Sequence, residues 1–235
     1  MIIQPYYEEP GIIIYHGDCR DILSHLPKVD LVLTDPPYGI NYNREVEPQS
    51  KHVFSHRSQL SVVAFDDEPF DPVPFLSIGR GRIFWGANCY ASRLPDSPKW
   101  LSWDKVTRNA LKLRIAEIEL AWTDCVGRSQ CFRYLWSGSY RAGEHREYYH
   151  PTQKPVLLMR WCMELPGVPI GTILDPFMGS GTTLVAAKQL GRKAIGIEIE
   201  KKYCDIAIDR LKQEVLPLEY IEQLKTPEQN QELFE

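Results

Sequence analysis

The chain has 235 residues, of which 43% are hydrophobic and 25% charged, as is usual for a globular protein with one sizeable core. It has no apolar run of about 18 residues and no basic start followed by an apolar segment, so neither a transmembrane helix nor a secretion signal is expected. The net charge of −4 is unevenly distributed, because residues 99–160 contain eleven Lys and Arg against six Asp and Glu. This basic middle favours local contact with phosphate groups, or is simply a solvated basic surface.

Cysteine and histidine spacing argues against disulfide and metal chemistry. The six cysteines are dispersed without a CxxC pair, which predicts reduced, mostly buried thiols in a cytoplasmic protein. The six histidines show no metal-binding spacing, and the pair His145 and His150 lies in a loop-like stretch. No metal site is therefore predicted.

The predicted elements begin with a strand at Ile12–Tyr15 and a short helix from Arg20 to Leu26. Asp30–Thr34 is a nearly continuous apolar run closed by Asp35-Pro36-Pro37, the pattern of a buried parallel strand that the prolines end. Residues 40–74 are polar and irregular, and are expected to form a lid or a substrate-contacting loop. Further strands are predicted at 82–85, 99–103 and 118–123, the last two as a pair.

The second half of the chain alternates between helices and strands. Helices are predicted over 157–164, 182–190 and 201–214, and strands at 172–174 and 194–199. Repeated strand, turn and helix predict the α/β class, with a Rossmann-like doubly wound sheet that is mostly parallel. Such sheets bind their ligands at the carboxyl ends of the strands.

The segment Asp35-Pro36-Pro37-Tyr38-Gly39 follows a predicted strand and carries polar groups in a rigid frame. Two prolines hold the backbone extended and remove its amide donors, which leaves the Asp35 carboxylate and the Pro36 carbonyl as fixed acceptors. Tyr38 places a flat aromatic face beside them. Acceptors next to an aromatic plate suit the amino edge of a planar base; the alternative is a rigid turn with Tyr38 packed in the core.

A glycine-containing turn separates a later predicted strand from a predicted helix. It reads DPFMGSGTT from Asp175 to Thr183, and Gly179 and Gly181 let the backbone turn tightly and approach a ligand. Glu198 ends the next predicted strand, where a carboxylate can accept both hydroxyls of a ribose. Leu184 stands where GxGxxG has its last glycine, and no GK[ST] occurs in the turn, so dinucleotide binding is disfavoured and an ATP phosphate loop is excluded.

These two motifs resemble those of the DNA amino-methyltransferases, which methylate the N6 of adenine or the N4 of cytosine. The family signature is [DNS]PPY together with a DPFxGSGTT-type turn, and the likeness covers most of the chain. DPPY precedes the glycine turn here by about 140 residues, which resembles the permuted β group of the family. The resemblance implies the fold of S-adenosylmethionine-dependent methyltransferases, with a small inserted target-recognition segment.

The resemblance also implies how one methyltransferase domain over residues 1–235 is organised. Its parts are expected to be a catalytic half at about 1–103, a target-recognition insert at about 104–149, a cofactor-binding half at about 150–213 and an acidic tail at 214–235. The tail is expected to fray.

The family assigns roles to matching positions of this sequence. S-adenosyl-L-methionine is the expected cofactor, with Asp18 facing its adenine and Glu198 its ribose, while polar groups of HPTQKP reach its methionine end. The expected cofactor-binding residues are Asp18, Cys19, Thr152, Gln153, Lys154, Asp175, Phe177, Gly179, Ser180, Gly181, Thr182, Thr183 and Glu198. The expected catalytic residues are Asp35, Pro36, Pro37 and Tyr38, and the candidates for DNA contact are Arg128, Arg133, Arg141 and Arg146.

The implied substrate is double-stranded DNA, from which the target base must be flipped out. Hydrogen bonds from its amino protons to Asp35 and the Pro36 carbonyl are expected to stabilise the positive charge that develops on nitrogen, while Tyr38 stacks on the base. No membrane contact is expected. Whether the chain forms a homodimer, and whether it serves a restriction endonuclease or acts as an orphan enzyme, is left open by the sequence.

Three alternatives to adenine-N6 methylation stay open. N4-methylation of cytosine uses the same geometry, although Asp before PPY favours adenine within the family. Methylation of protein glutamine or of RNA is disfavoured, because those related enzymes typically place the glycine turn before an NPPY-type motif. A catalytically inactive DNA-binding or cofactor-binding module would not need the acceptors that this sequence retains at Asp35.

Overall fold

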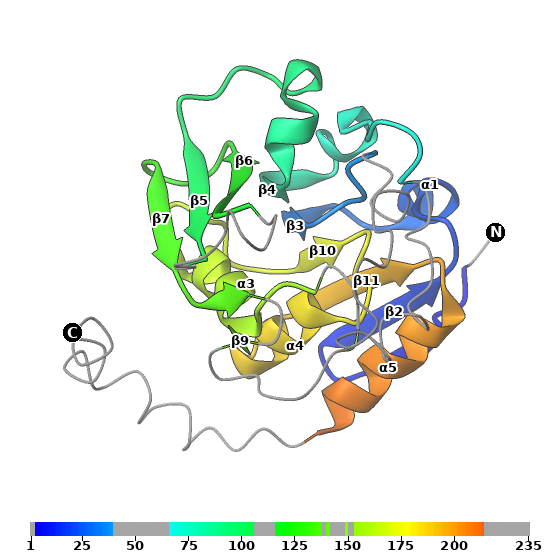
Figure 1. Cartoon of the computed structure of the whole chain (residues 1–235). Coiled ribbons are helices and arrows are strands. Elements are labelled where there is room, and N and C mark those ends of the chain that lie inside the picture. The colour runs from blue at the N-terminus through cyan, green and yellow to red at the C-terminus, as the bar shows by residue number, and fades with distance from the viewer. Residues whose placement is uncertain are drawn as a thin grey trace.

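The computed structural model describes residues 3–39, 66–105, 116–137, 140–141, 149 and 153–213 (Figure 1). Most of the stretch expected to form a lid, and two predicted site residues, Thr152 and Arg146, lie outside these ranges. The histidine pair considered for metal binding lies outside them as well.

Within the described residues, the chain builds a nine-stranded sheet of order β1-β2-β11-β10-β3-β4-β6-β5-β7. Its strands are β1 (Tyr7–Glu9), β2 (Ile12–His16), β3 (Val29–Thr34), β4 (Gly79–Trp85), β5 (Trp100–Asp104), β6 (Ile118–Thr123), β7 (Gln130–Arg133), β10 (Ile173–Asp175) and β11 (Ala194–Glu198). A separate two-stranded ribbon pairs β8 (Trp136–Ser137) with β9 (Tyr140–Arg141).

The helices are α1 (Cys19–Ile22), α3 (Val156–Glu164), α4 (Thr182–Gln189) and α5 (Lys201–Lys212). Short 3-10 turns occur at η1 (Leu23–His25), η3 (Val73–Phe75), η4 (Ala87–Cys89) and η5 (Ala91–Arg93). No helix among the residues described is long and apolar enough to cross a membrane.

The centre of the sheet is parallel, as the sequence predicts. Strands β2, β11, β10, β3 and β4 run in one direction. Strands β1 and β6 run antiparallel to their neighbours, whereas β5 is again parallel to the central set, and β7 is parallel to β5. The chain crosses from β2 to β3 and later fills the gap between them with β10 and β11. Segments far apart in sequence therefore meet at the middle of the sheet.

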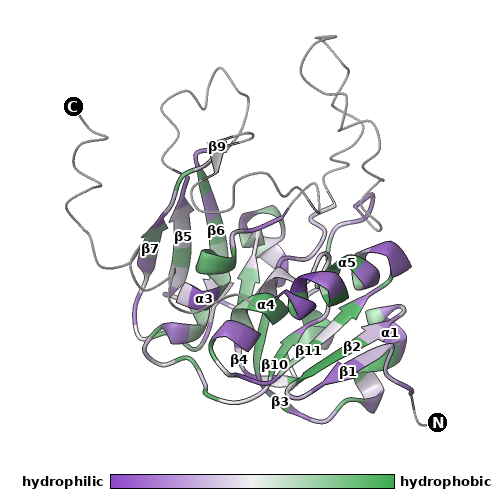
Figure 2. Cartoon of the chain, turned by 90° about the horizontal axis from the view of Figure 1, so that it is seen from below, coloured by the Kyte–Doolittle hydropathy of each residue, from purple (hydrophilic) through white to green (hydrophobic). Residues whose placement is uncertain are grey.

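Two apolar layers cover the faces of the sheet. In β3, Leu31 and Leu33 face the side covered by α3, α4 and α5, while Val32 faces the side covered by α1 and the 3-10 turns (Figure 1). This alternation is what a strand buried on both faces requires. Figure 2 shows the central strands in hydrophobic colours and polar residues along α5, whose Tyr203 nevertheless packs inward.

The predicted elements agree with the structure where the pattern is apolar. The expected strand pair is β5 and β6, which are antiparallel, and the expected helix from Arg20 becomes α1 followed by η1. The sequence reasoning missed β1 and β7, because both lie at sheet edges and only half of their residues are shielded. Three tryptophans of the central stretch are buried in the core, namely Trp103, Trp122 and Trp136.

The cysteines are less buried than expected, since Cys89 and Cys131 are exposed and Cys125 is half-buried. All six are unpaired, and Cys19, Cys162 and Cys204 are buried. The described ranges also contain no cluster of His, Cys, Asp and Glu able to hold a metal ion.

We predict that Gly181→Ala destabilises the fold by ~2–4 kcal/mol, more than the same exchange at Gly191. Both glycines have positive φ, +79° and +64°, so both substitutions strain the backbone. A Cβ on Gly181 would lie only 2.6 Å from the Cβ of Ala207 in α5, whereas nothing lies within 4 Å of one on Gly191. Urea denaturation of both variants separates packing from backbone strain. Equal losses would show that α5 does not press on the glycine turn.

Candidate active site

The predicted site residues gather at one edge of the sheet. Because β2, β3, β10 and β11 are parallel, their carboxyl ends share that edge. Asp18 follows β2, Asp35 follows β3, Asp175 ends β10 and Glu198 ends β11. The fold thus brings both motifs to the place where doubly wound sheets bind their ligands.

A buried hydrogen bond joins the two motifs across neighbouring strands. Thr34, the last residue of β3, donates its hydroxyl to Asp175 Oδ1 over 2.7 Å, and the Phe177 amide donates to the same oxygen over 3.2 Å. Burial raises the pKa of Asp175 to about 6 despite these donors. Asp175, expected to bind cofactor, therefore acts first as a brace that fixes DPPY beside the glycine turn.

The glycine turn is held tightly from several sides. Gly181 donates to the Met178 carbonyl over 2.8 Å, and the φ angles of Gly179 and Gly181, +51° and +79°, are those that favour glycine. The buried Arg210 of α5 donates to the Ser180 carbonyl over 2.7 Å and to the Thr182 hydroxyl over 3.1 Å. This arginine carries no motif signal, and its role appears only once α5 is packed on the turn.

Glu198 connects the turn to the neighbouring strand. Its Oε2 accepts from the Gly179 amide over 3.0 Å, and its Oε1 accepts from the Glu200 amide over 2.8 Å. Burial raises the pKa of this carboxyl. Each carboxylate oxygen can accept a further hydrogen bond, so the group remains suited to a pair of ribose hydroxyls.

Other residues expected at the cofactor site have defined surroundings. Asp18 caps α1 by accepting from the Arg20 amide over 2.9 Å, and the hydrogen bond from the Arg20 side chain lowers its pKa. Cys19 is buried. The half-buried Phe177 packs its ring 5.6 Å from that of Phe70. Gln153 and Thr183 are both buried.

The DPPY segment forms a compact polar cluster. Lys154 lies 2.5 Å from Asp35 Oδ2 and donates to the Tyr38 hydroxyl over 3.2 Å, while that hydroxyl donates to Asp35 Oδ1. The Tyr38 ring packs directly on the backbone of Gly86, where a Cβ would collide with it. Both oxygens of Asp35 are thus engaged by donors of the protein itself. Lys154, expected near the cofactor, lies here on the Asp35 carboxylate.

Glu119 extends this cluster and was not predicted. It stands near the start of β6, lies 3.1 Å from Lys154 Nζ through Oε2, and pairs with Lys105 through Oε1. Burial alone raises the pKa of Glu119, but Lys154 and Lys105 overcome it and hold that pKa at about 2. The two carboxylates raise the pKa of Lys154 further above its usual value although burial opposes them. No sequence motif links these residues, because β6 reaches this edge only through its antiparallel pairing.

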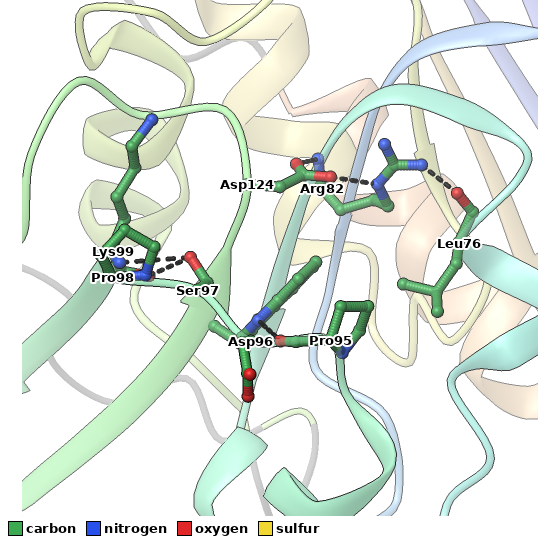
Figure 3. A pocket seen from close by; sticks show the side chains of 9 residues that line it. Leu76, Arg82, Pro95, Asp96, Ser97, Pro98, Lys99 and Asp124 are labelled. Carbon is green, nitrogen blue, oxygen red and sulfur yellow. Dashed lines mark hydrogen bonds and ion pairs between the residues drawn. The ribbon is translucent and has the colours of Figure 1, made fainter.

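A hollow of about 340 Å³ lies elsewhere, at the opposite edge of the sheet (Figure 3). Its lining includes Arg82, Ser97 and Asp124, and Arg82 Nε is paired with Asp124 over 2.6 Å. None of the motif residues lines it, so it is not the site that the sequence predicts.

The arginines expected to contact DNA are not all placed together. Arg133 is exposed at the carboxyl end of β7, 3.5 Å from Asp104, on the same edge as Asp35. Arg128 is exposed in the turn between β6 and β7, which lies at the opposite edge. The structure therefore separates Arg128 from the site. The side chain of Arg141 is outside the described part of the structure.

Comparison with known proteins agrees with the motifs. The family model of DNA methylases of the N6/N4 type matches residues 95–209. The Type II methyltransferase M.ScaI of Streptomyces caespitosus is 28% identical over 92% of this chain and 86% of its own. The Type II methyltransferase M2.LlaDCHI of Lactococcus lactis subsp. cremoris is 26% identical over 90% of this chain and 93% of its own.

Solved structures share the fold. PvuII DNA methyltransferase (cytosine-N4-specific) superposes with a TM-score of 0.60 at 16% identity, covering 94% of this chain and 93% of its own. The M1.HpyAVI–SAM complex gives a TM-score of 0.53 at 24% identity, covering 86% and 100%. The family match over residues 95–209 and the two Type II methyltransferases show that this chain is similar to DNA methyltransferases of the N6/N4 class.

We predict that Asp175→Asn removes a pH-dependent part of the stability. The pKa of this carboxyl is about 6 in the fold, above the ~3.9 of an exposed aspartate, so protonation favours folding. That contribution is complete below pH ~4 and is lost as the pH rises through about 6, amounting to ~2–3 kcal/mol. Urea denaturation from pH 4 to 8 should show wild type losing stability relative to the variant over that range. Asp209→Asn, at an exposed position, controls for removal of a charge. Parallel pH profiles for wild type and Asp175→Asn would contradict the assignment.

Proposed function

We propose that the protein transfers the methyl group of S-adenosyl-L-methionine to the exocyclic 6-amino group of a flipped-out adenine in double-stranded DNA. The observation that carries this proposal is the Thr34–Asp175 hydrogen bond, which ties the DPPY strand end to the glycine turn. It supports the proposal because it holds the segment proposed to bind the base next to the turn proposed to bind the cofactor. Positioning two reactants in this way supplies a large part of the acceleration of a group transfer.

The cofactor side of the proposal rests on the glycine turn. The Glu198 carboxylate at the end of β11 accepts from the Gly179 amide of this turn, and we propose that it also accepts the ribose hydroxyls. The half-buried Phe177 offers an apolar wall beside the turn. Bound S-adenosyl-L-methionine supplies an electrophilic methyl group. Hydrogen bonds from Arg210 and to Asp175 brace the turn.

The base side of the proposal rests on acceptors. Asp35 and the Pro36 carbonyl are to accept the two protons of the amino group, which draws its lone pair out of conjugation with the ring and stabilises the charge on nitrogen. Tyr38 and Lys154 donate to Asp35 in the structure. We infer that the entering amino group takes over these bonds, and that the released Tyr38 ring stacks on the base. Catalytic hydrogen bonds commonly form only in such a complex.

The DNA side rests on the basic residues at the same edge. Arg133 is exposed there, and a flipped nucleotide requires its flanking phosphates to be held. We propose Arg133, together with Arg141 and Arg146, as contacts of the target-recognition segment. Arg128, at the far edge, is left out of this proposal.

Asp35→Asn is predicted to lower methyl transfer by at least ~100-fold while leaving cofactor affinity nearly unchanged. The amide retains the size of the carboxylate but loses its charge and one acceptor. Transfer of labelled methyl from S-adenosyl-L-methionine to duplex DNA measures the first effect, and calorimetry the second. Nucleoside analysis of the wild-type product then identifies the base. N6-methyladenine supports the proposal, whereas N4-methylcytosine would show that cytosine is the target base. A wild type that binds DNA and cofactor without transferring methyl would favour the inactive binding module.

Glu198→Gln is predicted to weaken binding of S-adenosyl-L-methionine by about 10- to 100-fold, because hydrogen bonds to a charged acceptor are worth ~1.5–3 kcal/mol. The variant also places an amide donor opposite one of the two backbone amides that Glu198 accepts. Glu200→Gln is the matched control, since it removes the same charge and keeps its backbone donor. Titration calorimetry without DNA measures both. Unaltered affinity in Glu198→Gln would remove this residue from the cofactor site.

A further inference from the structure

Four charged side chains form an alternating row that ends at the proposed catalytic carboxylate. Lys105 pairs with Glu119, Glu119 lies 3.1 Å from Lys154, and Lys154 lies 2.5 Å from Asp35. They come from three separate places in the fold: the end of β3, the antiparallel pair β5–β6, and the segment just before α3. The side chains of Lys154 and Lys105 are only 6% and 13% exposed. So closely packed a row fixes which oxygen each ammonium group can reach.

Lys154 creates a problem for the proposed reaction. An ammonium group on Asp35 competes with the amino group of the base for Oδ2, and it opposes the positive charge that develops on the target nitrogen. A second carboxylate on the other side of the same ammonium relieves both effects. Glu119 occupies that position, and it binds Lys105 through its other oxygen, so its own carboxylate is fixed in direction.

We propose that Glu119 is a positioning residue of the catalytic site, which acts by drawing the Lys154 ammonium away from Asp35 when the amino group of the base arrives. This inference rests on the proposed function. In the proposed arrangement, Glu119 contacts neither the base nor the cofactor. Lys154 moves between two carboxylates that lie within its reach, and Asp35 remains an anionic acceptor throughout.

The pKa directions fit this arrangement. Burial raises the pKa of Asp35, Lys154 lowers it and Glu119 raises it again. Loss of the charge on Glu119 must therefore lower the pKa of Asp35, and loss of the charge on Lys154 must raise it. Glu119, with a pKa of about 2, stays ionised over the whole working range. Among the described residues, the other titratable groups coupled to this row are Tyr38, Cys89, Tyr90 and Asp175.

The first test needs neither DNA nor cofactor. The ¹³C resonance of the Asp35 carboxyl, assigned with Asp35→Asn in protein labelled at aspartate, is followed against pH in wild type and variants. Glu119→Gln should move its midpoint to lower pH by about 1 and Lys154→Gln should move it to higher pH by a similar amount. Glu117→Gln, an exposed position two residues before Glu119, is the matched control and should leave the midpoint in place. Midpoints that do not separate in these opposite directions overturn the proposal.

The second test measures methyl transfer to duplex DNA. Glu119→Gln should lower kcat about tenfold with little change in KM for S-adenosyl-L-methionine, because it alters the acceptor and not the cofactor site. Glu119→Asp, which keeps the charge, should recover a large part of kcat and the wild-type midpoint. Thermal unfolding shows whether Glu119→Gln is folded, and Glu119→Asp serves as the second probe if it is not. Equal kcat in wild type and a folded Glu119→Gln overturns the positioning role.

These two tests distinguish failure of the inference from failure of the proposed function. If the Asp35 midpoint responds as expected while wild type transfers no methyl to DNA, the charge coupling stands and the proposed function is wrong. If wild type is active and the midpoint ignores Glu119, the proposed function stands and the positioning role is overturned.

Discussion

The parallel pairing of β3 with β10 is the constraint on which the rest of the site depends. The two strands are remote in sequence, and their register places Thr34 opposite the end of β10, where it donates to Asp175. That bond is buried and goes to a carboxylate, so its loss is expected to cost ~1.5–3 kcal/mol. Because Asp35 directly follows Thr34 and Phe177 closely follows Asp175, one local interaction sets the distance between the acceptor cluster and the glycine turn.

The same edge of the sheet concentrates charge that the fold must neutralise internally. Asp35, Glu119, Lys105 and Lys154 come from elements that parallel and antiparallel pairing bring together. Isolated, each of these partly or fully buried groups would be costly, and a buried pair breaks even only when its remaining hydrogen bonds are satisfied. Tyr38 completes the set by donating to Asp35. The arrangement suits a site that must later exchange these donors for those of a substrate.

The sequence predicted the parts of this site that are local and missed those that depend on sheet order. DPPY and DPFMGSGTT each combine a strand end with a rigid turn, so their chemistry can be inferred from neighbouring residues alone. Glu119 and Arg210 carry no such signal: one belongs to a strand that reaches the site because β6 is antiparallel, the other to a helix face packed on the glycine turn. Arg128 shows the opposite error, in which residues close in sequence are separated by the fold. The directions of β6 and β7 place Arg128 and Arg133 at opposite edges of the sheet.

The donors that occupy Asp35 also bear on which bases the site admits. A hydroxyl and an ammonium group contact its two oxygens, so a ligand that replaces them must bring donors of its own. In the proposed reaction, the exocyclic amino groups of adenine and cytosine each bring two protons, whereas thymine has no exocyclic amino group and its O4 would face the carboxylate with no proton between them. An unpaired buried carboxylate costs more than the bond it loses, so the acceptors discriminate strongly against thymine. Guanine carries an amino group at C2, so its exclusion, like the choice between adenine and cytosine, falls to the shape of the pocket around the ring, where the Tyr38 ring lies against Gly86.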